Sequence, residues 1–305
     1  MDRESIPTAE ERPTHAVRIT RGKLAPGLYV TATPIGNLGD VTLRALSVLA
    51  SADLVLCEDT RVTRRLLDRY GLRPKLLAYH EHNAAAMRPR VMDRLGAGES
   101  VALVSDAGTP LVSDPGYKLV QGAIESGHKI FPIPGPSAAL AALVAAGLPT
   151  DRFFFEGFLP AKSGQRKTRI EEIAEIPATL ILYESGPRLA ASVKDLAGGL
   201  GARDAAICRE LTKKFEEVRR GTLADLAAHY DKAGEPKGEI VIVIAPPAAE
   251  SKTVSFEALD AKLTAALKKL SVKDAADLVV VETGMKRREV YQRALLLAGN
   301  REKTK

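Results

Sequence analysis

Three short stretches of glycine, proline and small polar residues follow apolar, strand-like runs of the chain. They are Thr33 to Asp40, Ser105 to Gly116 and Ile133 to Ala138. Glycine and small side chains let a backbone approach a ligand closely. The middle stretch also carries two carboxylates, which suit a cationic ligand such as a sulfonium better than a polyphosphate. Ser137, in the third stretch, either caps the helix that follows or faces an adenine or ribose edge.

Other common binding motifs are missing from the sequence. It contains neither G-x-G-x-x-G nor G-x-x-x-x-G-K-[ST], so the phosphate cradles of dinucleotide-binding and P-loop folds are lacking. No Cys/His cluster has the spacing of metal ligands, and we expect no metal site. Cys57 and Cys208 each lie inside an apolar run, and we expect both as reduced, buried thiols.

The elements that position these stretches alternate between strands and helices. Strands are predicted at 27–32, 54–57, 101–104 and 129–132, with helices at 41–52, 63–70, 117–126 and 138–146. Such alternation indicates a mostly parallel sheet covered on both faces. In an open sheet of this kind, the loops after the strands form the ligand crevice.

A second α/β set follows a break at 147–150. Its predicted strands are 152–156, 179–183, 205–209 and 239–245, and its helices 163–174, 187–198 and 222–230. Beyond a linker at 245–249, one helix begins after Ser271 and another covers 286–297, with a glycine-containing turn between them, a pattern typical of a helix-turn-helix. The predicted organisation is a flexible extension at 1–26, α/β domains at 27–148 and 149–247, and a helical tail at 254–300.

The chain has 305 residues, of which 45% are apolar and 27% are charged, and this is the composition of a globular protein. From Ser251 onward there are 12 Lys and Arg against 7 Asp and Glu, so most of the net charge of +6 lies in the tail. Such a tail either meets phosphate or serves as a solubilising end. Because no apolar run approaches the roughly 20 residues of a membrane span, we expect a cytoplasmic protein without membrane contact.

Five stretches in fixed order carry a resemblance to a known family. They are Thr33 to Leu38, Cys57-Glu58-Asp59-Thr60-Arg61, Tyr79-His80-Glu81-His82-Asn83, Ser105 to Gly116 and Pro134 to Ala138. Together they resemble the tetrapyrrole methylase superfamily, in the branch that methylates ribose 2′-hydroxyls of small-subunit ribosomal RNA. The resemblance covers Gly27 to Ala245, and the helical tail is similar to that of many members. The second and third stretches set the RNA branch apart.

The resemblance implies a fold of two α/β domains with S-adenosylmethionine in a cleft between them. It also implies 2′-O-methylation of a cytidine ribose in the decoding region of 16S rRNA, on free rRNA or the assembled 30S subunit, by a homodimer. The cofactor-binding residues it implies are Pro34, Asp106, Ala107, Gly108, Thr109, Pro110, Ser137, Ala138, Tyr183, Glu184, Leu211 and Gly238.

Two further sets of residues concern the RNA. A ribose hydroxyl is a poor nucleophile while protonated, and the candidates for a general base are Asp59, Glu58 and His80. Arginines after a strand end are suited to phosphate, although a solvated helix face is the alternative. The RNA-binding candidates are Arg61, Arg64, Arg65, Lys286 and Arg287.

Two other functions stay open on the sequence. A methylase of a corrinoid or porphyrin precursor would share the fold and cofactor, but would lack the Cys57–Arg61 and Tyr79–Asn83 stretches and the basic tail. A nucleic-acid-binding module without catalysis would have no need of the Ser105–Gly116 stretch beside a second α/β domain.

Overall fold

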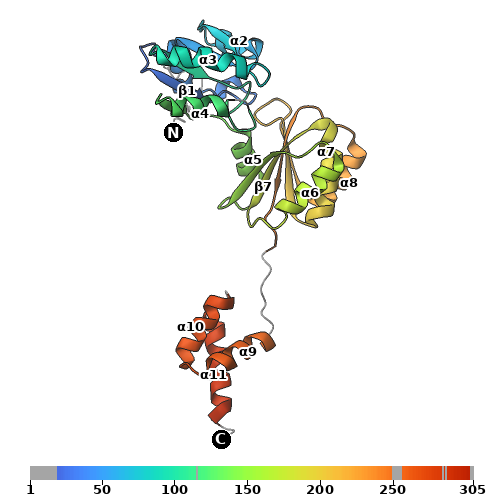
Figure 1. Ribbon diagram of the computed structural model, residues 1–305. Helices are drawn as coiled ribbons and strands as arrows, with labels where there is room; N and C mark the ends of the chain where they lie inside the picture. The colour runs from blue at the N-terminus through green and yellow to red at the C-terminus, as the bar shows by residue number, and fades with distance from the viewer. Residues whose placement is uncertain (1–18, 115, 249–255, 284, 286, 303–305) are drawn as a thin grey trace, which may run out of the picture. The chain divides into compact units, whose positions relative to one another are not determined.

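The computed structural model describes residues 19–114, 116–248, 256–283, 285 and 287–302. These residues form two compact units, each described by itself (Figure 1). The first comprises residues 19–171 and 179–245, and the second comprises 172–178 and the chain from Pro246 on. None of the helices in these ranges is both long and apolar enough to cross a membrane.

The first sheet of the α/β unit is entirely parallel. Its order is β3-β2-β4-β1-β5, formed by β1 (Gly27–Thr31), β2 (Leu54–Cys57), β3 (Leu76–Ala78), β4 (Ser100–Leu103) and β5 (Ile130–Ile133). The four predicted strands are confirmed. The edge strand β3 and helix α3 (Ala84–Gly96) were not predicted, because β3 is short and half-buried and α3 contains Pro89.

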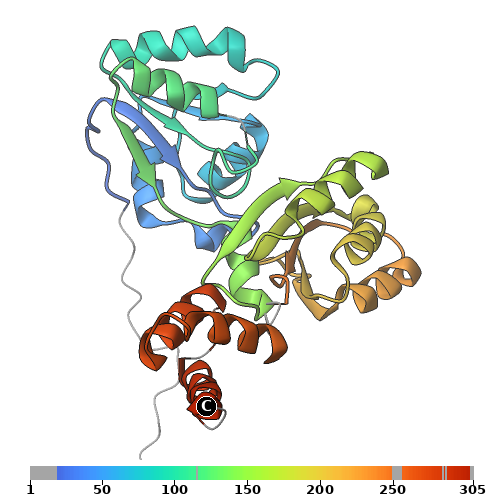
Figure 2. The same cartoon turned by 60° about the horizontal axis from the view of Figure 1, so that its bottom comes forward.

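Helices cover both faces of this sheet (Figure 2). Helices α1 (Leu43–Ser51) and α2 (Thr60–Arg69) share a core with one face, and α3 and α4 (Tyr117–Glu125) share a core with the other. Because both faces are buried, the strands read as continuous apolar runs instead of alternating ones. Cys57 is fully buried in the first of these cores as a free thiol, as predicted.

The second sheet is mixed, unlike the first. Its order is β6-β7-β10-β8-β9, formed by β6 (Phe153–Phe158), β7 (Thr179–Ser185), β8 (Asp204–Arg209), β9 (Glu217–Thr222) and β10 (Glu239–Ile244). Only β6 and β7 pair in parallel, and the other three pairings are antiparallel. In this sheet the alternation of strands and helices does not predict whether neighbouring strands are parallel, because β9 follows β8 without an intervening helix. Strand β9 was not predicted, since its sequence Glu-Val-Arg-Arg-Gly-Thr is mainly polar.

Helix α5 (Ala138–Ala146) covers one face of the second sheet, with its alanines packed on β7, β8 and β10. Helices α6 (Ser163–Ile173), α7 (Gly186–Leu200) and α8 (Leu223–Ala233) lie on the other face (Figure 1). Cys208, in β8, is a buried free thiol on the α5 side. The boundary predicted near 148 falls between the sheets, but both belong to one compact unit, so that boundary stays a prediction.

The helical unit contains α9 (Phe256–Ala266), α10 (Val272–Thr283) and α11 (Arg287–Glu302). Its core holds Leu259, Leu263, Ala276, Val279, Val290 and Ala294. Ser271 caps α10 as predicted, because its Oγ accepts the Asp274 N–H over 3.2 Å. Helix α9 makes this a three-helix unit instead of the predicted pair, and the predicted break at Gly284 lies outside the described residues.

The predicted extension at 1–26 is described only from residue 19. There, Ile19 and Leu24 pack against the core beneath α1 and α2, and the Tyr29 hydroxyl donates to the Ala25 carbonyl over 2.9 Å. This last part of the segment therefore lies against the first sheet.

Candidate functional site

The loops after β1, β2 and β4 meet because these strands are neighbours in the parallel sheet. Thr33 and Gly108 exchange backbone hydrogen bonds of 2.8 and 3.1 Å, which join the loop after β1 to the loop after β4. Gly108 has a φ of 81°, a conformation that glycine adopts without strain. The Asp59 N–H then donates to an oxygen of Asp106 over 2.9 Å, which joins the loop after β2 to the same group.

A cavity of about 360 Å³ opens beside these loops, and we call it the first cavity. Five carboxyl groups line it, and no Lys, Arg or His stands among the described residues of its wall. Its volume lies within the roughly 300–1,000 Å³ range of small-molecule sites. The carboxyl-bearing residues are Glu58, Asp106, Asp114, Glu184 and Glu239.

Burial shifts the titration of three of these carboxyl groups. The pKa of Asp114 is raised to about 6, first by burial and then by the charges of Glu58 and Asp106. Burial, followed by the charge of Asp106, also raises the pKa of Glu58, and burial is the main cause of the raised pKa of Asp106. The wall therefore favours a positively charged ligand, whose binding would stabilise the ionised carboxylates.

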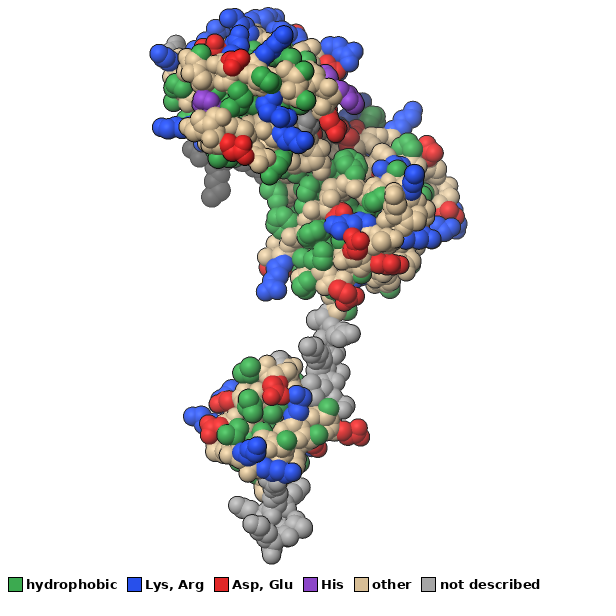
Figure 3. All heavy atoms as spheres, in the orientation of Figure 1, with side chains coloured by type: hydrophobic (Ala, Val, Ile, Leu, Met, Phe, Trp, Pro, Cys, Tyr) green, Lys and Arg blue, Asp and Glu red, His purple; other side chains and the backbone are tan. Residues whose placement is uncertain are grey.

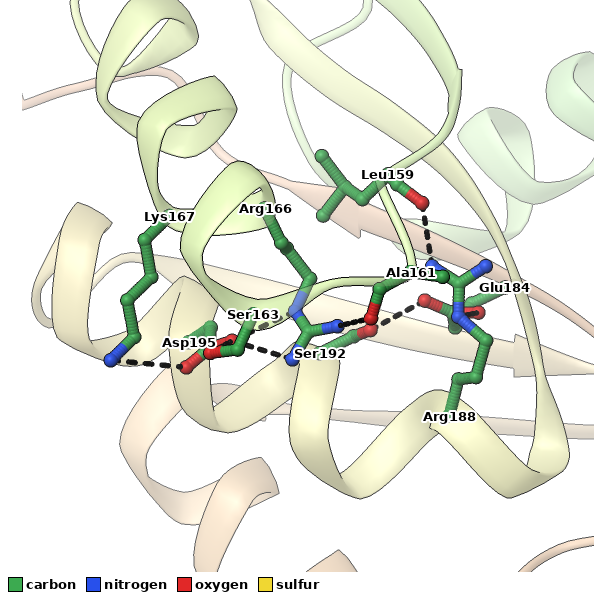
Figure 4. A network of polar contacts seen from close by, with 9 residues as sticks. All are labelled: Leu159, Ala161, Ser163, Arg166, Lys167, Glu184, Arg188, Ser192 and Asp195. Atoms are coloured by element: carbon green, nitrogen blue, oxygen red, sulfur yellow. Dashed lines mark hydrogen bonds and ion pairs between the residues drawn. The ribbon is translucent and has the colours of Figure 1, made fainter.

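Glu184 is fixed in the wall by a polar network (Figure 4). Its carboxylate accepts a 2.5 Å hydrogen bond from the Ser192 hydroxyl and forms an ion pair with Arg188 at 3.3 Å. Arg188 in turn donates to the Leu159 carbonyl over 2.6 Å. Because the Glu184 side chain is only 1% exposed, these partners offset the cost of burying its charge.

Backbone strain is concentrated in the loops around the cavity. The non-glycine residues with left-handed φ values, among those described, are Leu111, Ser113, Glu210 and Thr212. All lie in the loop after β4 or the loop after β8. Such conformations cost of order 1–3 kcal/mol each and tend to cluster at binding sites. The two loops thus have a conformation that only the surrounding structure maintains.

A second cavity, of about 450 Å³, adjoins the first. The two share Ile35, Asp106, Ala107 and Glu239. Unlike the first, the second has cationic residues in its wall, Arg65 from α2 and Lys213 from the loop after β8. The remaining residues of its wall are Thr33, Pro34, Gly36, Leu38, Val62, Thr63, Leu66 and Ser105.

Most of the predicted cofactor residues line the first cavity. They are Asp106, Ala107, Gly108, Thr109, Ser137, Ala138, Tyr183, Glu184 and Leu211. Pro34 lines the second cavity, whereas Pro110 and Gly238 line neither. Ser137 precedes α5 but makes no capping hydrogen bond with its side chain, which leaves its hydroxyl available to a ligand.

The three candidates for the general base differ in their surroundings. Glu58 lines the first cavity. Asp59 lines neither cavity; it caps α2 through the Arg61 N–H and pairs with the Arg61 guanidinium at 2.6 Å, which lowers its pKa to about 2. His80 also lines neither cavity, and its buried Nδ1 has no hydrogen-bond partner among the residues that the structure describes. Of these three candidates Glu58 is the one that lines a cavity, and the low pKa of Asp59 makes its carboxylate a weak base.

The predicted RNA-binding residues are similarly divided. Arg65 lines the second cavity, whereas Arg61 is held by Asp59 and Arg64 lines neither cavity. In the helical unit Arg287 pairs with Asp277 at 2.6 Å, and Lys286 lies outside the described residues. Two of the predicted RNA-binding residues, Arg61 and Arg287, are therefore already paired with an aspartate.

The sequence does not predict a place in the site for several residues of the first cavity, among them Phe158, Cys208 and Val241. The register of the second sheet explains their position, since Val241 pairs with Tyr183 on one side and with Cys208 on the other. These side chains form a row across the α5 face. The sequence signal for this row is the alternation of side chains along β7, β8 and β10, but it identifies the row only once the antiparallel pairing of these strands is known.

Among the described residues no group of three or more His, Cys, Asp or Glu could hold a metal ion.

Comparison with known families agrees with this geometry. Residues 27–227 match the family described as Tetrapyrrole (Corrin/Porphyrin) Methylases, and residues 253–298 match the family described as RsmI C-terminal HTH domain. The first match covers well over half of the chain.

Curated relatives are similar to this chain over nearly their whole length. A protein of Mesorhizobium japonicum named Ribosomal RNA small subunit methyltransferase I is 55% identical over 90% of this chain and 93% of its own. A protein of the same name from Vibrio cholerae is 45% identical to this chain, and one from Escherichia coli O157:H7 is 43% identical. Each match covers 88% of this chain and 94% of the relative.

Solved structures share the fold at low sequence identity. A diphthine synthase has a TM-score of 0.56 at 19% identity, over 72% of this chain and 89% of its own. A uroporphyrin-III C-methyl transferase from Thermus thermophilus, complexed with S-adenyl homocysteine, has a TM-score of 0.51 at 20% identity. The match covers 71% of this chain and 96% of that protein's chain. At these identities the likeness concerns the fold alone.

Proposed function

The chain belongs to the tetrapyrrole methylase family, and from that premise we propose that it is an S-adenosylmethionine-dependent methyltransferase of small-subunit ribosomal RNA. The reaction places a methyl group on the 2′-hydroxyl of a cytidine ribose in the decoding region of 16S rRNA. The relatives at 43–55% identity support the substrate, because all carry the name of a small-subunit rRNA methyltransferase. The observation that carries the chemistry is the first cavity, because its described wall has five carboxyl groups and no Lys, Arg or His, which suits a sulfonium donor.

The residues of this wall fit the cofactor. S-adenosylmethionine carries a sulfonium and an ammonium group, and carboxylates such as Asp106 and Asp114 would stabilise these charges. Ser137 and Tyr183 offer hydroxyl groups to its adenosine, and Ala138 and Leu211 offer apolar contacts. When bound, the cofactor supplies an electrophilic methyl group.

Glu58 is the residue that best supports proton removal from the acceptor hydroxyl. Burial and Asp106 raise its pKa, which makes its carboxylate a stronger base than that of Asp59. His80 lies near enough for its charge to lower the pKa of Glu58. Asp59 serves a different role, because its carboxylate fixes the start of α2 and the position of Arg61.

The exposed sides of α2 and α3, which cover opposite faces of the first sheet, carry cations suited to RNA. Lys and Arg side chains gather over these helices (Figure 3), and the exposed ones include Arg61, Arg65, Arg69 and Arg90. Such a surface attracts phosphate independently of sequence. We place the helical unit in the same role, because its match is to a helix-turn-helix domain and its charge excess is positive.

The two alternative functions receive less support. Methylases of tetrapyrroles are similar to this chain at only 18–22% identity, and their likeness supports the fold without the substrate. A binding module without catalysis does not account for an acid-lined cavity that both sheets build.

We also infer that the protein is a homodimer. Helix α5 packs one face on the second sheet, yet Leu140 and Val144 of its other face are 50% and 80% exposed. Figure 3 shows apolar side chains gathered in this region. A second copy of the chain would cover them, and Val144→Asp should then shift the species measured by light scattering from dimer to monomer.

The test of the proposed function uses the complete protein. It is incubated with labelled S-adenosylmethionine and with 30S subunits, or free 16S rRNA, from cells lacking this modification. The expected result is label on one cytidine 2′-oxygen, located by nuclease digestion and mass spectrometry. Label on a tetrapyrrole precursor but not on RNA, or binding of RNA without transfer, would refute the proposal.

A further inference from the structure

The second cavity has the features of a nucleotide site and is distinct from the acid-lined first cavity. Its cationic residue Arg65 lies on the exposed side of α2 and has no hydrogen-bond or ion-pair partner among the described residues. Arg61, one turn earlier, is already held by Asp59. Arg65 is therefore the arginine of this helix that is both at a cavity and available to an anion.

Part of the wall of the second cavity is apolar and held in position by hydrogen bonds. Leu38 and Val62 are 37% and 36% exposed, which gives a partly open apolar surface beside Arg65. The Tyr70 hydroxyl donates to the Leu38 carbonyl over 2.8 Å, and Asn37 caps the short helix at Leu38–Asp40 through the Gly39 N–H. The flat face of a base can bury apolar area against such an aliphatic surface.

Lys213 closes the second cavity on the side of the second sheet. Its Nζ lies 2.8 Å from oxygens of both Glu210 and Glu239, and although burial opposes it, these two carboxylates raise the Lys213 pKa. The stem of Lys213 crosses Gly36, where an added Cβ would lie 2.4 Å from its Cγ. Because its charge is already balanced, Lys213 acts as a wall of the cavity, and Arg65 remains the cation available to phosphate.

The two cavities meet at a shared wall that includes Asp106. A ligand in the second cavity thus borders the ligand of the first without occupying the same space. Resting on the function proposed above, we propose that the second cavity receives the acceptor nucleotide of the RNA. Arg65 binds a phosphate flanking that nucleotide, its base packs on Leu38 and Val62, and its ribose faces the shared wall.

Two substitutions test this site, each with a matched control. Arg65→Ala removes the phosphate contact, and Arg69→Ala removes an exposed arginine one turn along α2 that lines neither cavity. Val62→Trp fills the cavity without changing charge, and Leu43→Trp places the same bulk on exposed α1. The readouts are the Kd for unmethylated 30S subunits across a salt series, the KM for these subunits, and the Kd for S-adenosylmethionine by calorimetry.

The expected result separates the two cavities. Arg65→Ala should weaken subunit binding about tenfold and lower the salt slope by roughly one, as for a lost phosphate contact. Val62→Trp should raise the KM for subunits at least about tenfold, since a bulky side chain in a recognition pocket excludes the ligand. Both should leave the Kd for S-adenosylmethionine within about twofold. Arg69→Ala should weaken subunit binding clearly less than Arg65→Ala, because Arg69 lies on the same helix surface but lines neither cavity, and Leu43→Trp should resemble the unaltered protein.

Three results would overturn the inference. One is equal loss of subunit binding in Arg65→Ala and Arg69→Ala, which would assign the effect to the helix surface. Another is weakened S-adenosylmethionine binding with intact subunit binding, which would place the cofactor carboxylate at Arg65. The third is a normal KM in Val62→Trp. If the proposed function itself fails, the unaltered protein transfers no label to 30S subunits, so the two failures are distinguishable.

Discussion

The backbone N–H of Asn37 donates a hydrogen bond to the Oγ1 of Thr212 over 3.2 Å, although 175 positions separate them in the chain. Asn37 belongs to the loop after β1, and Thr212 to the loop after β8, so this bond links the two sheets at the edge of both cavities. Thr212 has a φ of 67°, an unusual value for a β-branched residue. The link therefore depends on a strained loop that is held in place by its neighbours.

The identity of the general base can be tested by comparing Glu58→Gln with Asp59→Asn. Loss of general base catalysis typically lowers kcat by 10²–10⁴-fold. We expect a loss of about that size for Glu58→Gln, with S-adenosylmethionine binding weakened only a few-fold. Asp59→Asn should lower kcat less, because an asparagine still caps α2. A larger loss of kcat in Asp59→Asn, with normal cofactor binding, would assign the base to Asp59.

The affinity for the charged cofactor should depend on pH through Asp114. Its pKa is raised to about 6, so its carboxylate ionises as the pH rises from 5 to 7, and attraction for a sulfonium increases. We expect S-adenosylmethionine to bind about fivefold more tightly over this interval relative to the neutral thioether S-adenosylhomocysteine. Calorimetry with Asp114→Asn should show a constant ratio, and an unchanged pH dependence in that variant would contradict the assignment.

The same titration affects the stability of the free protein. The folded-state pKa of Asp114 lies above its unfolded value, so its contribution to stability is present at low pH and is lost as the pH rises through about 6. In thermal unfolding without cofactor, the stability of Asp114→Asn should therefore not show this loss as the pH rises through about 6. The same pH-dependent loss in both proteins would assign it to another group.

A pair of glycine substitutions in α7 tests the packing at its start. At Gly186 a Cβ would lie 1.7 Å from the Pro236 carbonyl oxygen, whereas at Gly198 nothing lies within 4 Å. We expect Gly186→Ala to lower the free energy of unfolding by about 2 kcal/mol or more. Gly198→Ala should raise it by roughly 0.5–1 kcal/mol, because alanine is the better helix former. Chemical denaturation measures both, and equal effects would show that the start of α7 can shift.

Removal of the helical unit tests its role in RNA binding. The unit has its own core and pairs Arg293 with Asp260 inside it, so a chain ending at Pro246 should retain the α/β unit. We expect that truncated protein to bind 30S subunits at least about tenfold more weakly while its affinity for S-adenosylmethionine stays unchanged. The opposite outcome, lost cofactor affinity with intact subunit binding, would exclude this role.

The sequence was a good guide to regular elements and to the loops of the first sheet. Parallel strands buried on both faces give apolar runs, and the residues after them lie at one edge, so Asp106, Gly108 and Ser137 could be placed from spacing together with the resemblance. Helix α5 begins and ends as predicted, because Gly147 with a φ of 75° terminates it.

The parts that escaped prediction depend on long-range pairing. The direction of β10 is set by its pairing with β7 and with β8, each more than 20 residues away in the chain, and without these pairings the row of Tyr183, Cys208 and Val241 is not visible. The ion pairs that hold Asp59 and Arg287 depend on side-chain conformation, which residue type does not reveal. The second cavity is likewise built from loops of both sheets, and no single stretch signals it.

The alignment of the first sheet has a consequence for how the protein tolerates change. Leu103 lies level with Val30 in β1 and with Leu56 in β2, and from this common row each strand runs a few residues to Thr33, Glu58 or Asp106. One inserted residue in β4 would displace Asp106 by about 3.3 Å and turn the strand's side chains to the opposite faces. Homologues should thus vary in what their exposed loops contain, while the lengths of these three central strands stay fixed.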